Sequence, residues 1–145
     1  MKRIVCLLVL IAVTSGGRLS AQAPRSRPDF SGSWSGPSVA LTITQNATTL
    51  TVTKGPETRM YNLDGSERRW TNATGGQFTA RARWVQSALV IETMTVGSIG
   101  SWTDLEVYSL DHGREASAPQ LSVVYVFTRE AGPMMGTSVT TYARH

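Results

Sequence analysis

Two carboxylates stand two positions apart in the segment from Trp102 to Leu110. Side chains two positions apart on a β-strand point to the same side of the sheet, so Asp104 and Glu106 would share a face. A pair of acid–base carboxylates needs such an arrangement, and Glu92 could join them if its strand lies alongside in a barrel. A solvated strand face explains the same pattern more simply. We therefore assign no catalytic residue, and a carboxylate-dependent hydrolase or isomerase is kept only as an alternative.

The two histidines do not suggest a metal centre. His112 lies in an Asp-His-Gly turn signal, and His145 ends the chain. A zinc site needs three or four protein ligands, while Cys6, the only cysteine, lies in the apolar N-terminal run. No Gly-x-Ser-x-Gly motif accompanies the many serines. We expect neither a metal site nor a cofactor.

Arginine and aromatic residues could form a binding surface of another kind. Arg81 and Arg83 share one face of a predicted strand, and Arg68 and Arg69 directly precede Trp70. Arginine beside aromatic rings can bind an anionic glycan, a lipid headgroup or a partner protein. A plain solubilising face is the simpler interpretation.

The first 23 residues have the features of an export signal. Lys2 and Arg3 precede an apolar run from Ile4 to Val13, and small residues follow as far as Ala23. The run is much shorter than the roughly 20 apolar residues that span a bilayer. We therefore expect cleavage after Ala23 rather than an uncleaved anchor, which places the mature chain in the periplasm or outside the cell without a stable membrane anchor.

Cleavage also changes the charge balance. It removes three of the 14 basic residues and leaves 11 against 10 acidic residues, so the net charge of +4 overstates the charge of the folded domain. We expect no nucleic-acid partner, because a basic binding face is then missing.

The pattern of the remaining chain predicts one β domain. Residues 24–29 are polar and contain prolines, which indicates an extended tether before a domain over 30–145. The clearest strand covers 78–84, where apolar residues at even positions alternate with Arg81 and Arg83. Asp64-Gly65 is a strong turn signal, from which Ser66–Thr71 is expected to pair back onto the preceding strand.

Eight to nine short strands joined by hairpin-length loops favour an all-β fold, an antiparallel up-and-down β-barrel. A β-sandwich is the alternative, because alternation shows which face is buried but not whether the sheet closes.

The segment Asp29–Trp34 contains Gly32 and Trp34 as a Gly-x-Trp motif, which resembles the opening motif of lipocalin-like and avidin-like barrels, the calycins. The order of segments is more closely similar to that of a family of small exported bacterial proteins with lipocalin-like barrels. The matching segments are 29–34, 41–45, 50–53, 61–65, 82–84, 89–93 and 108–111.

The resemblance implies structural roles for a few residues. In calycins the first-strand tryptophan closes the barrel floor and a late arginine lies across it, which would be a cation–π contact. Trp34 matches the tryptophan by position, and Gly32 belongs to its motif. Arg129 is the first choice for the arginine and Arg144 the second. The family has no established activity, so function stays open.

The leading functional hypothesis is an exported binding module for a small apolar or amphipathic ligand. Its ligand-binding candidates are the aromatic residues expected to face inward: Phe78, Trp84, Trp102, Tyr125 and Phe127. The same residues would equally form an ordinary core. The alternative from another class is a non-catalytic structural or protein-interaction module of the cell envelope, which contacts a partner protein through Arg81 and Arg83.

Overall fold

The structure is a computed structural model that describes residues 27–98, 100–112, 118–129 and 136–145. The expected signal peptide, 1–23, lies outside these residues. Within the described ranges the chain forms ten strands and has no helix that is long and apolar enough to cross a membrane. The strands are β1 (Gly32–Ser35), β2 (Ala40–Gln45), β3 (Thr49–Lys54), β4 (Glu57–Asn62), β5 (Arg68–Thr71), β6 (Gln77–Val85), β7 (Ala88–Gly97), β8 (Gly100–Asp111), β9 (Gln120–Arg129) and β10 (Gly136–Arg144).

All ten strands belong to one antiparallel sheet with the order β4-β3-β2-β1-β10-β9-β8-β7-β6-β5. The two edge strands, β4 and β5, are consecutive in the chain, and the sheet curls into a nearly closed barrel. The predicted all-β, up-and-down architecture is confirmed, with ten strands instead of eight to nine.

One predicted pairing is wrong. Strand β5 does not turn back onto β4 but pairs with β6, so that the seam of the barrel lies between β4 and β5. Two contacts hold β5 on β6: the ring of Trp70 stacks on Phe78 with centroids 5.2 Å apart, and Glu67 just before β5 forms a 2.6 Å ion pair with Arg81. Aromatic stacking of this kind stabilises cross-strand pairs.

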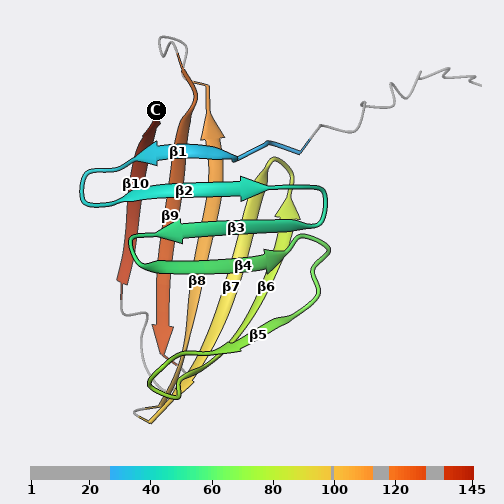
Figure 1. Ribbon diagram of the computed structural model, residues 1–145, viewed down its shortest axis with the longest axis vertical. Helices are drawn as coiled ribbons and strands as arrows, with labels where there is room; N and C mark the ends of the chain where they lie inside the picture. Colours follow the sequence, from blue (N-terminus) through green and yellow to red (C-terminus); the bar gives the residue numbers. More distant parts are fainter. Residues whose placement is uncertain (1–26, 99, 113–117, 130–135) are drawn as a thin grey trace, which may run out of the picture.

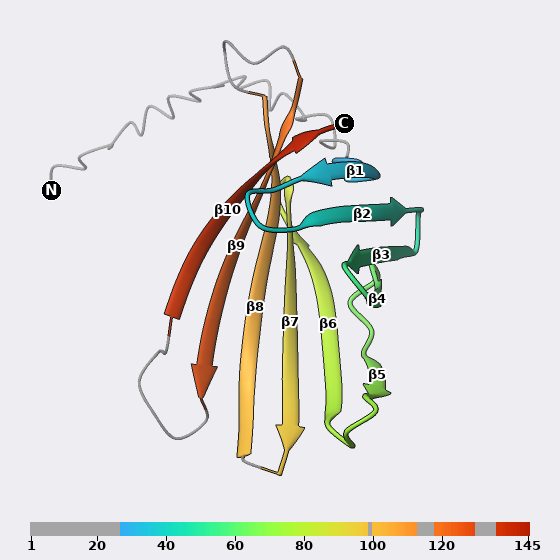
Figure 2. The ribbon, with the colours of Figure 1, turned by 60° about the vertical axis from the view of Figure 1, so that its left-hand side comes forward.

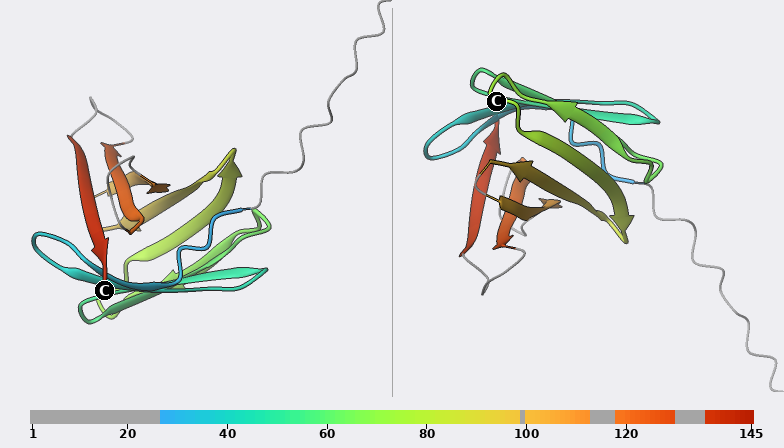
Figure 3. Two further views of the ribbon diagram at one scale, coloured as in Figure 1. Left: turned by 90° about the horizontal axis from the view of Figure 1, so that it is seen from above. Right: turned by 90° about the horizontal axis from the view of Figure 1, so that it is seen from below.

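The two halves of the sheet cross each other. Strands β1–β4 run across the long strands β7–β10 in Figure 1, and Figure 2 shows that they cover only one end of those strands. Seen from above, β1–β4 close one side of the barrel, with β6 on one flank and β10 on the other (Figure 3, left). We call the end of the barrel that β1–β4 cover the closed end; at the other end β6–β9 extend beyond these strands (Figure 2).

Alternation separates the inside of the barrel from the outside. On β6, Ala80 and Ala82 are buried while Arg81 and Arg83 are exposed, as the sequence predicted. The register places Ala82 beside Ile91 of β7. Inner residues of neighbouring strands thus form continuous rows across the barrel wall.

The closed end contains the main core. Trp34 is fully buried, and its indole Nε1 donates a 2.9 Å hydrogen bond to the carbonyl of Phe30. The Phe30 amide in turn donates to Oε1 of Gln45 at 3.1 Å, which fixes the entry of the chain. Around them pack Leu41, Ile43, Leu50, Val52, Tyr61, Leu63, Ala80, Ala82, Leu89, Ile91, Tyr108, Leu121, Val123 and Tyr142.

Arg144, and not Arg129, is the arginine that lies over Trp34. Its guanidinium carbon is 5.5 Å from the ring centroid, and its Nη2 donates to the Ser31 carbonyl at 2.9 Å. Arg129 is placed opposite Trp102 by the register of β8 and β9, at the far end of the strands. Gly32 has a φ of +142°, and a Cβ there would lie 3.2 Å from Nε of Arg144. Glycine at this position therefore lets the arginine pack close to the chain.

Candidate functional site

A cavity of about 570 Å³ lies between β8–β10 on one side and β2–β4 on the other. Its wall combines apolar, phenolic and charged side chains. We call it the tyrosine–carboxylate cavity, and its lining residues are Val39, Leu41, Val52, Lys54, Gly55, Pro56, Glu57, Arg59, Tyr61, Asp104, Glu106, Tyr108, Val123, Tyr125, Ser138, Thr140 and Tyr142. The volume is within the range of about 300–1,000 Å³ that is typical of small-molecule sites.

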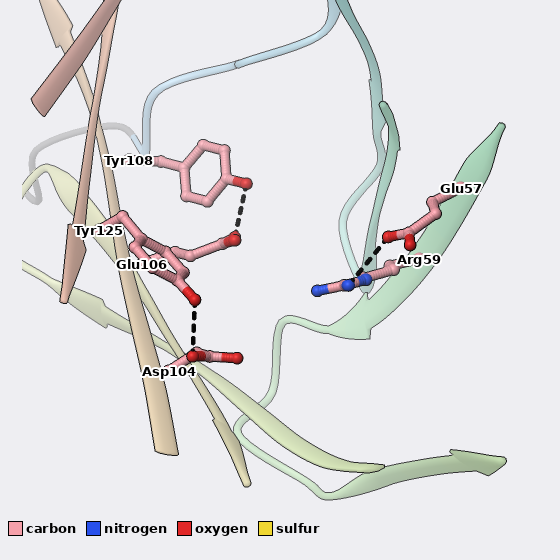
Figure 4. Close-up of polar contacts among 6 residues, drawn as sticks. All are labelled: Glu57, Arg59, Asp104, Glu106, Tyr108 and Tyr125. Atoms are coloured by element: carbon pink, nitrogen blue, oxygen red, sulfur yellow. Dashed lines mark hydrogen bonds and ion pairs between the residues drawn. The ribbon is translucent and has the colours of Figure 1, made fainter. Parts of the chain in front are cut away.

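Strand β8 supplies the two carboxylates of this cavity. A solvated strand face is not where Asp104 and Glu106 lie: both line the cavity and are half-buried, on the same face of β8 as the buried Tyr108. The reason is the strict alternation of the strand, which puts positions 104, 106 and 108 on one side. Figure 4 shows both carboxylates pointing into the space between the two layers.

Two tyrosines hold these carboxylates in place. The hydroxyl of Tyr125 donates a 2.7 Å hydrogen bond to Oδ1 of Asp104, and that of Tyr108 donates a 2.8 Å bond to Oε2 of Glu106 (Figure 4). Hydrogen bonds to an ionised acceptor are short and strong. Both strands that carry these groups, β8 and β9, are paired within the sheet, so the carboxylates are oriented before any ligand arrives.

The electrostatics of the cavity keep its phenols protonated. Burial, followed by the negative charge of Glu106, raises the pKa values of Tyr61, Tyr108 and Tyr142. Burial and the hydrogen bond to Asp104 raise the pKa of Tyr125, with a smaller contribution from Glu106. The sequence contains four tyrosines, and all four line this cavity and feel the charge of Glu106. At neutral pH they act as neutral hydrogen-bond donors.

Arg59 faces the carboxylates from β4. Its guanidinium points across the cavity toward β8 in Figure 4. Burial opposes its charge, but the neighbouring Tyr61 and Glu57 raise the pKa of Arg59 above its usual value, with a smaller contribution from Glu106. Its nearest acidic partner is Glu57 on its own strand, with a 2.9 Å ion pair. The arginine is therefore held at the cavity wall by Glu57.

The two carboxylates of β8 have no cationic partner of their own among the described residues. There, the ion pairs within 4.0 Å join Arg59 to Glu57 and Glu67 to both Arg69 and Arg81. Asp104 and Glu106 have only tyrosine hydroxyls as described side-chain partners. The lining as a whole contains three carboxylates against two basic groups, Lys54 and Arg59, so the cavity is acidic.

The five predicted ligand-binding aromatics are not brought together. Tyr125 lines the tyrosine–carboxylate cavity. Trp84 stacks on Phe30 at 5.8 Å, Phe78 stacks on Trp70, and Trp102 packs against Phe127 at 6.4 Å. The register puts Phe78, Thr95 and Trp102 in one row toward the end of the barrel that β1–β4 leave uncovered.

The other residues singled out by sequence lie apart from this cavity. Glu92 is exposed between the buried Ile91 and Thr93, so it is on the outer face and does not join Asp104 and Glu106. Arg81 is exposed and paired with Glu67. The ring of His145 contacts the hydroxyl of Ser35, and the described residues contain no cluster of three metal-binding side chains.

A smaller cavity of about 350 Å³ lies on the wall formed by β6 and the nearby turns. Arg27, Arg83 and Trp84 line it together with the turn residues Asp64 and Gly65. The guanidinium of Arg27 lies 5.5 Å from the Trp84 centroid, so the segment before β1 covers this ring. Its wall lacks the paired carboxylates and phenols of the larger cavity.

Sequence reasoning missed Arg59, Tyr61, Tyr108 and Tyr142. The sequence contained a signal for one of them. Asp104, Glu106 and Tyr108 occupy alternate positions of β8, so their side chains point to the same side of the sheet. When charged residues alternate along a strand with the same spacing as its buried aromatic residues, both kinds of side chain must face the interior. Arg59 and Tyr61 lie on β4, and their position opposite β8 depends on the crossing of the two halves of the sheet, which no local pattern encodes.

No protein-family model matches the chain, and no curated protein matches it either.

Proposed function

We propose that this chain is an exported small-molecule-binding barrel that holds an amphipathic ligand in the tyrosine–carboxylate cavity. The observation that carries the proposal is the pair of carboxylates inside the barrel, each oriented by a tyrosine hydroxyl and neither paired with a cation among the described residues. Both carboxylates are half-buried in the cavity wall, and a few fixed polar groups in an otherwise apolar pocket are typical of small-molecule sites.

The mixed character of the wall supports an amphipathic ligand. Leu41, Val52 and Val123 provide apolar surface, while Ser138 and Thr140 of β10 add hydroxyl groups. Small-molecule sites commonly combine an apolar lining with a few fixed polar groups. The aromatic residues expected to bind ligand become packing residues in this proposal, with the exception of Tyr125.

Export supports the same proposal from the sequence side. Every strand of the described barrel lies after position 23, so removal of residues 1–23 would leave all ten strands in place. The domain after that point contains no cysteine, so in an oxidising compartment it would depend on packing and not on disulfides. We therefore propose that the protein binds its ligand in the periplasm or outside the cell.

A carboxylate-dependent hydrolase or isomerase is the second candidate. It is favoured by one observation, namely that Asp104 and Glu106 line a cavity and are half-buried there. A general base needs such a position within reach of a bound substrate. Glu92 has no part in this candidate, because it is on the outer face.

Native mass spectrometry of protein purified from the cells that express it tests the proposal. We expect a mass excess that disappears on denaturation and that is lost in Thr140→Trp, because Thr140 is half-buried and lines the cavity from β10. Thr141→Trp is the matched control, because Thr141 is exposed and on the opposite face of the same strand. No mass excess, or an excess that Thr140→Trp retains, would overturn the proposal. Release of a chemically altered molecule would favour the enzyme.

A further inference from the structure

We infer that the tyrosine–carboxylate cavity selects ligands that carry a protonated amine, with the ammonium group held between Asp104 and Glu106 and surrounded by tyrosines. This inference rests on the proposed function and adds the chemical class of the ligand. It depends on the charge, the hydrogen-bonding capacity and the aromatic content of the wall.

The two carboxylates have unused hydrogen-bonding capacity. A carboxylate has two oxygens with about four lone-pair sites, yet each of these groups accepts one described side-chain hydrogen bond, from Tyr125 or from Tyr108. The bonds leave one oxygen of each carboxylate, Oδ2 of Asp104 and Oε1 of Glu106, without a described side-chain donor. An ammonium group brings three donors and a positive charge, which suits two adjacent acceptors.

The aromatic residues of the wall are all tyrosines. All four tyrosines of the chain line this cavity, whereas its four tryptophans and three phenylalanines are absent from the wall. A cation is attracted to the face of an aromatic ring, and a tyrosine adds a hydroxyl that can accept as well as donate. Tyrosines around two carboxylates therefore favour an organic cation over a neutral hydrocarbon.

The positive groups of the wall are poorly placed to hold an anion. Arg59 is already paired with Glu57 at 2.9 Å. Lys54 is exposed and lies next to the turn that joins β3 and β4. An anion would also lie against Asp104 and Glu106, and like charges at short range repel strongly in a partly buried site.

The cavity is also a poor site for a metal cation. Two carboxylates are the only acidic groups that β8 directs into it, and the described residues hold no cluster of three or more metal-binding side chains around them. Hard cations such as Ca²⁺ take six to eight oxygen ligands. A monovalent organic cation fits the wall better, and the cavity of about 570 Å³ leaves space for its apolar part.

Three fluorescent probes with one skeleton test the inference: dansylcadaverine, which carries a primary amine, its neutral N-acetyl derivative, and dansyl-6-aminohexanoate, which is anionic. Titration of the full mature protein should show that the amine binds at least about tenfold more tightly than the neutral probe, and that the anion binds most weakly. Glu106→Gln and Asp104→Asn should each reduce the preference for the amine about tenfold, because they remove charge and keep the shape.

Glu92→Gln is the matched control, since it removes the same charge from the outer face of the neighbouring strand β7. It should leave the preference for the amine unchanged. If the neutral probe binds as tightly as the amine, the inference about ligand class is overturned while the proposed binding function stands. If none of the three probes binds, both are overturned. A preference for the amine that survives Glu106→Gln and Asp104→Asn would also overturn the inference.

Discussion

The hydroxyl of Tyr125 donates a hydrogen bond to Asp104, which is not the residue directly opposite Tyr125 on the neighbouring strand. The register of β8 and β9 pairs Tyr125 with Glu106 and Asp104 with Phe127, yet the 2.7 Å hydrogen bond runs diagonally to Oδ1 of Asp104. Glu106 is bound instead by Tyr108, two residues along its own strand. Each carboxylate thus has its own tyrosine, and the second oxygen of each has no described side-chain donor.

The hydrogen bond from Tyr125 to Asp104 should make a measurable contribution to the free energy of unfolding. Tyr125→Phe keeps the ring and removes the donor, so we expect the free energy of unfolding to fall by about 1 kcal/mol, less than for a fully buried bond to a charged group. Urea unfolding measures the change. In a cycle with Asp104→Asn the two losses should not add, because both variants weaken the same bond. Strictly additive losses would contradict the assigned contact.

Ionisation of the tyrosines should be delayed in the folded protein. The pKa values of all four phenols are raised by burial and by the negative charge of Glu106. A spectrophotometric titration should therefore give a tyrosinate midpoint above the ordinary value of about 10, and unfolding in urea should return it to that value. Glu106→Gln should lower the folded midpoint. A folded midpoint near the ordinary value would show that the phenols do not share an acidic cavity.

The same shift makes stability depend on pH. A raised phenol pKa in the folded state means that, above pH about 10, the unfolded chain releases protons that the folded chain keeps. The free energy of unfolding should then fall as the pH rises beyond that value, and the tyrosines should contribute no slope at neutral pH. Unfolding by urea at several alkaline pH values provides the slope.

Arg144 at the closed end and Arg129 at the other end can be compared for their contributions to the free energy of unfolding. Arg144→Ala removes the cation over Trp34 and the bond to the Ser31 carbonyl, so we expect a loss of about 1–2 kcal/mol in the free energy of unfolding. Arg129→Ala, the matched control at the other end of the barrel, should change it by less than about 0.5 kcal/mol. Equal losses would mean that the contact with Trp34 does not stabilise the fold.

The sequence was sufficient for the architecture but only partly for the cavity. Alternation identified the two faces of β6, because Arg81 and Arg83 stand between small buried residues. It correctly put Asp104 and Glu106 on one face of β8, but the interpretation as a solvated strand face left out Tyr108, a buried residue on that same face. The choice of Arg129 over Arg144 failed for a different reason: contact with Trp34 depends on the β1–β10 pairing, which joins distant parts of the chain.

Replacement of Trp84 separates packing from binding among the aromatic residues. Trp84 stacks on the fully buried Phe30 with an interplanar angle of 7° and does not line the tyrosine–carboxylate cavity. Trp84→Ala should therefore lower the free energy of unfolding by about 3 kcal/mol, as truncation of a packed aromatic does, and leave the affinity for dansylcadaverine within about twofold once the protein is folded. Tyr125→Ala should do the reverse, with weakened binding and a smaller loss of stability, because Tyr125 faces the cavity and, unlike the equally half-buried Trp84, has no described stacking partner in the core. If Trp84→Ala abolished binding in protein that circular dichroism shows to be folded, the ligand would belong to the wall around Trp84, and the assignment of the site to the carboxylates of β8 would be wrong.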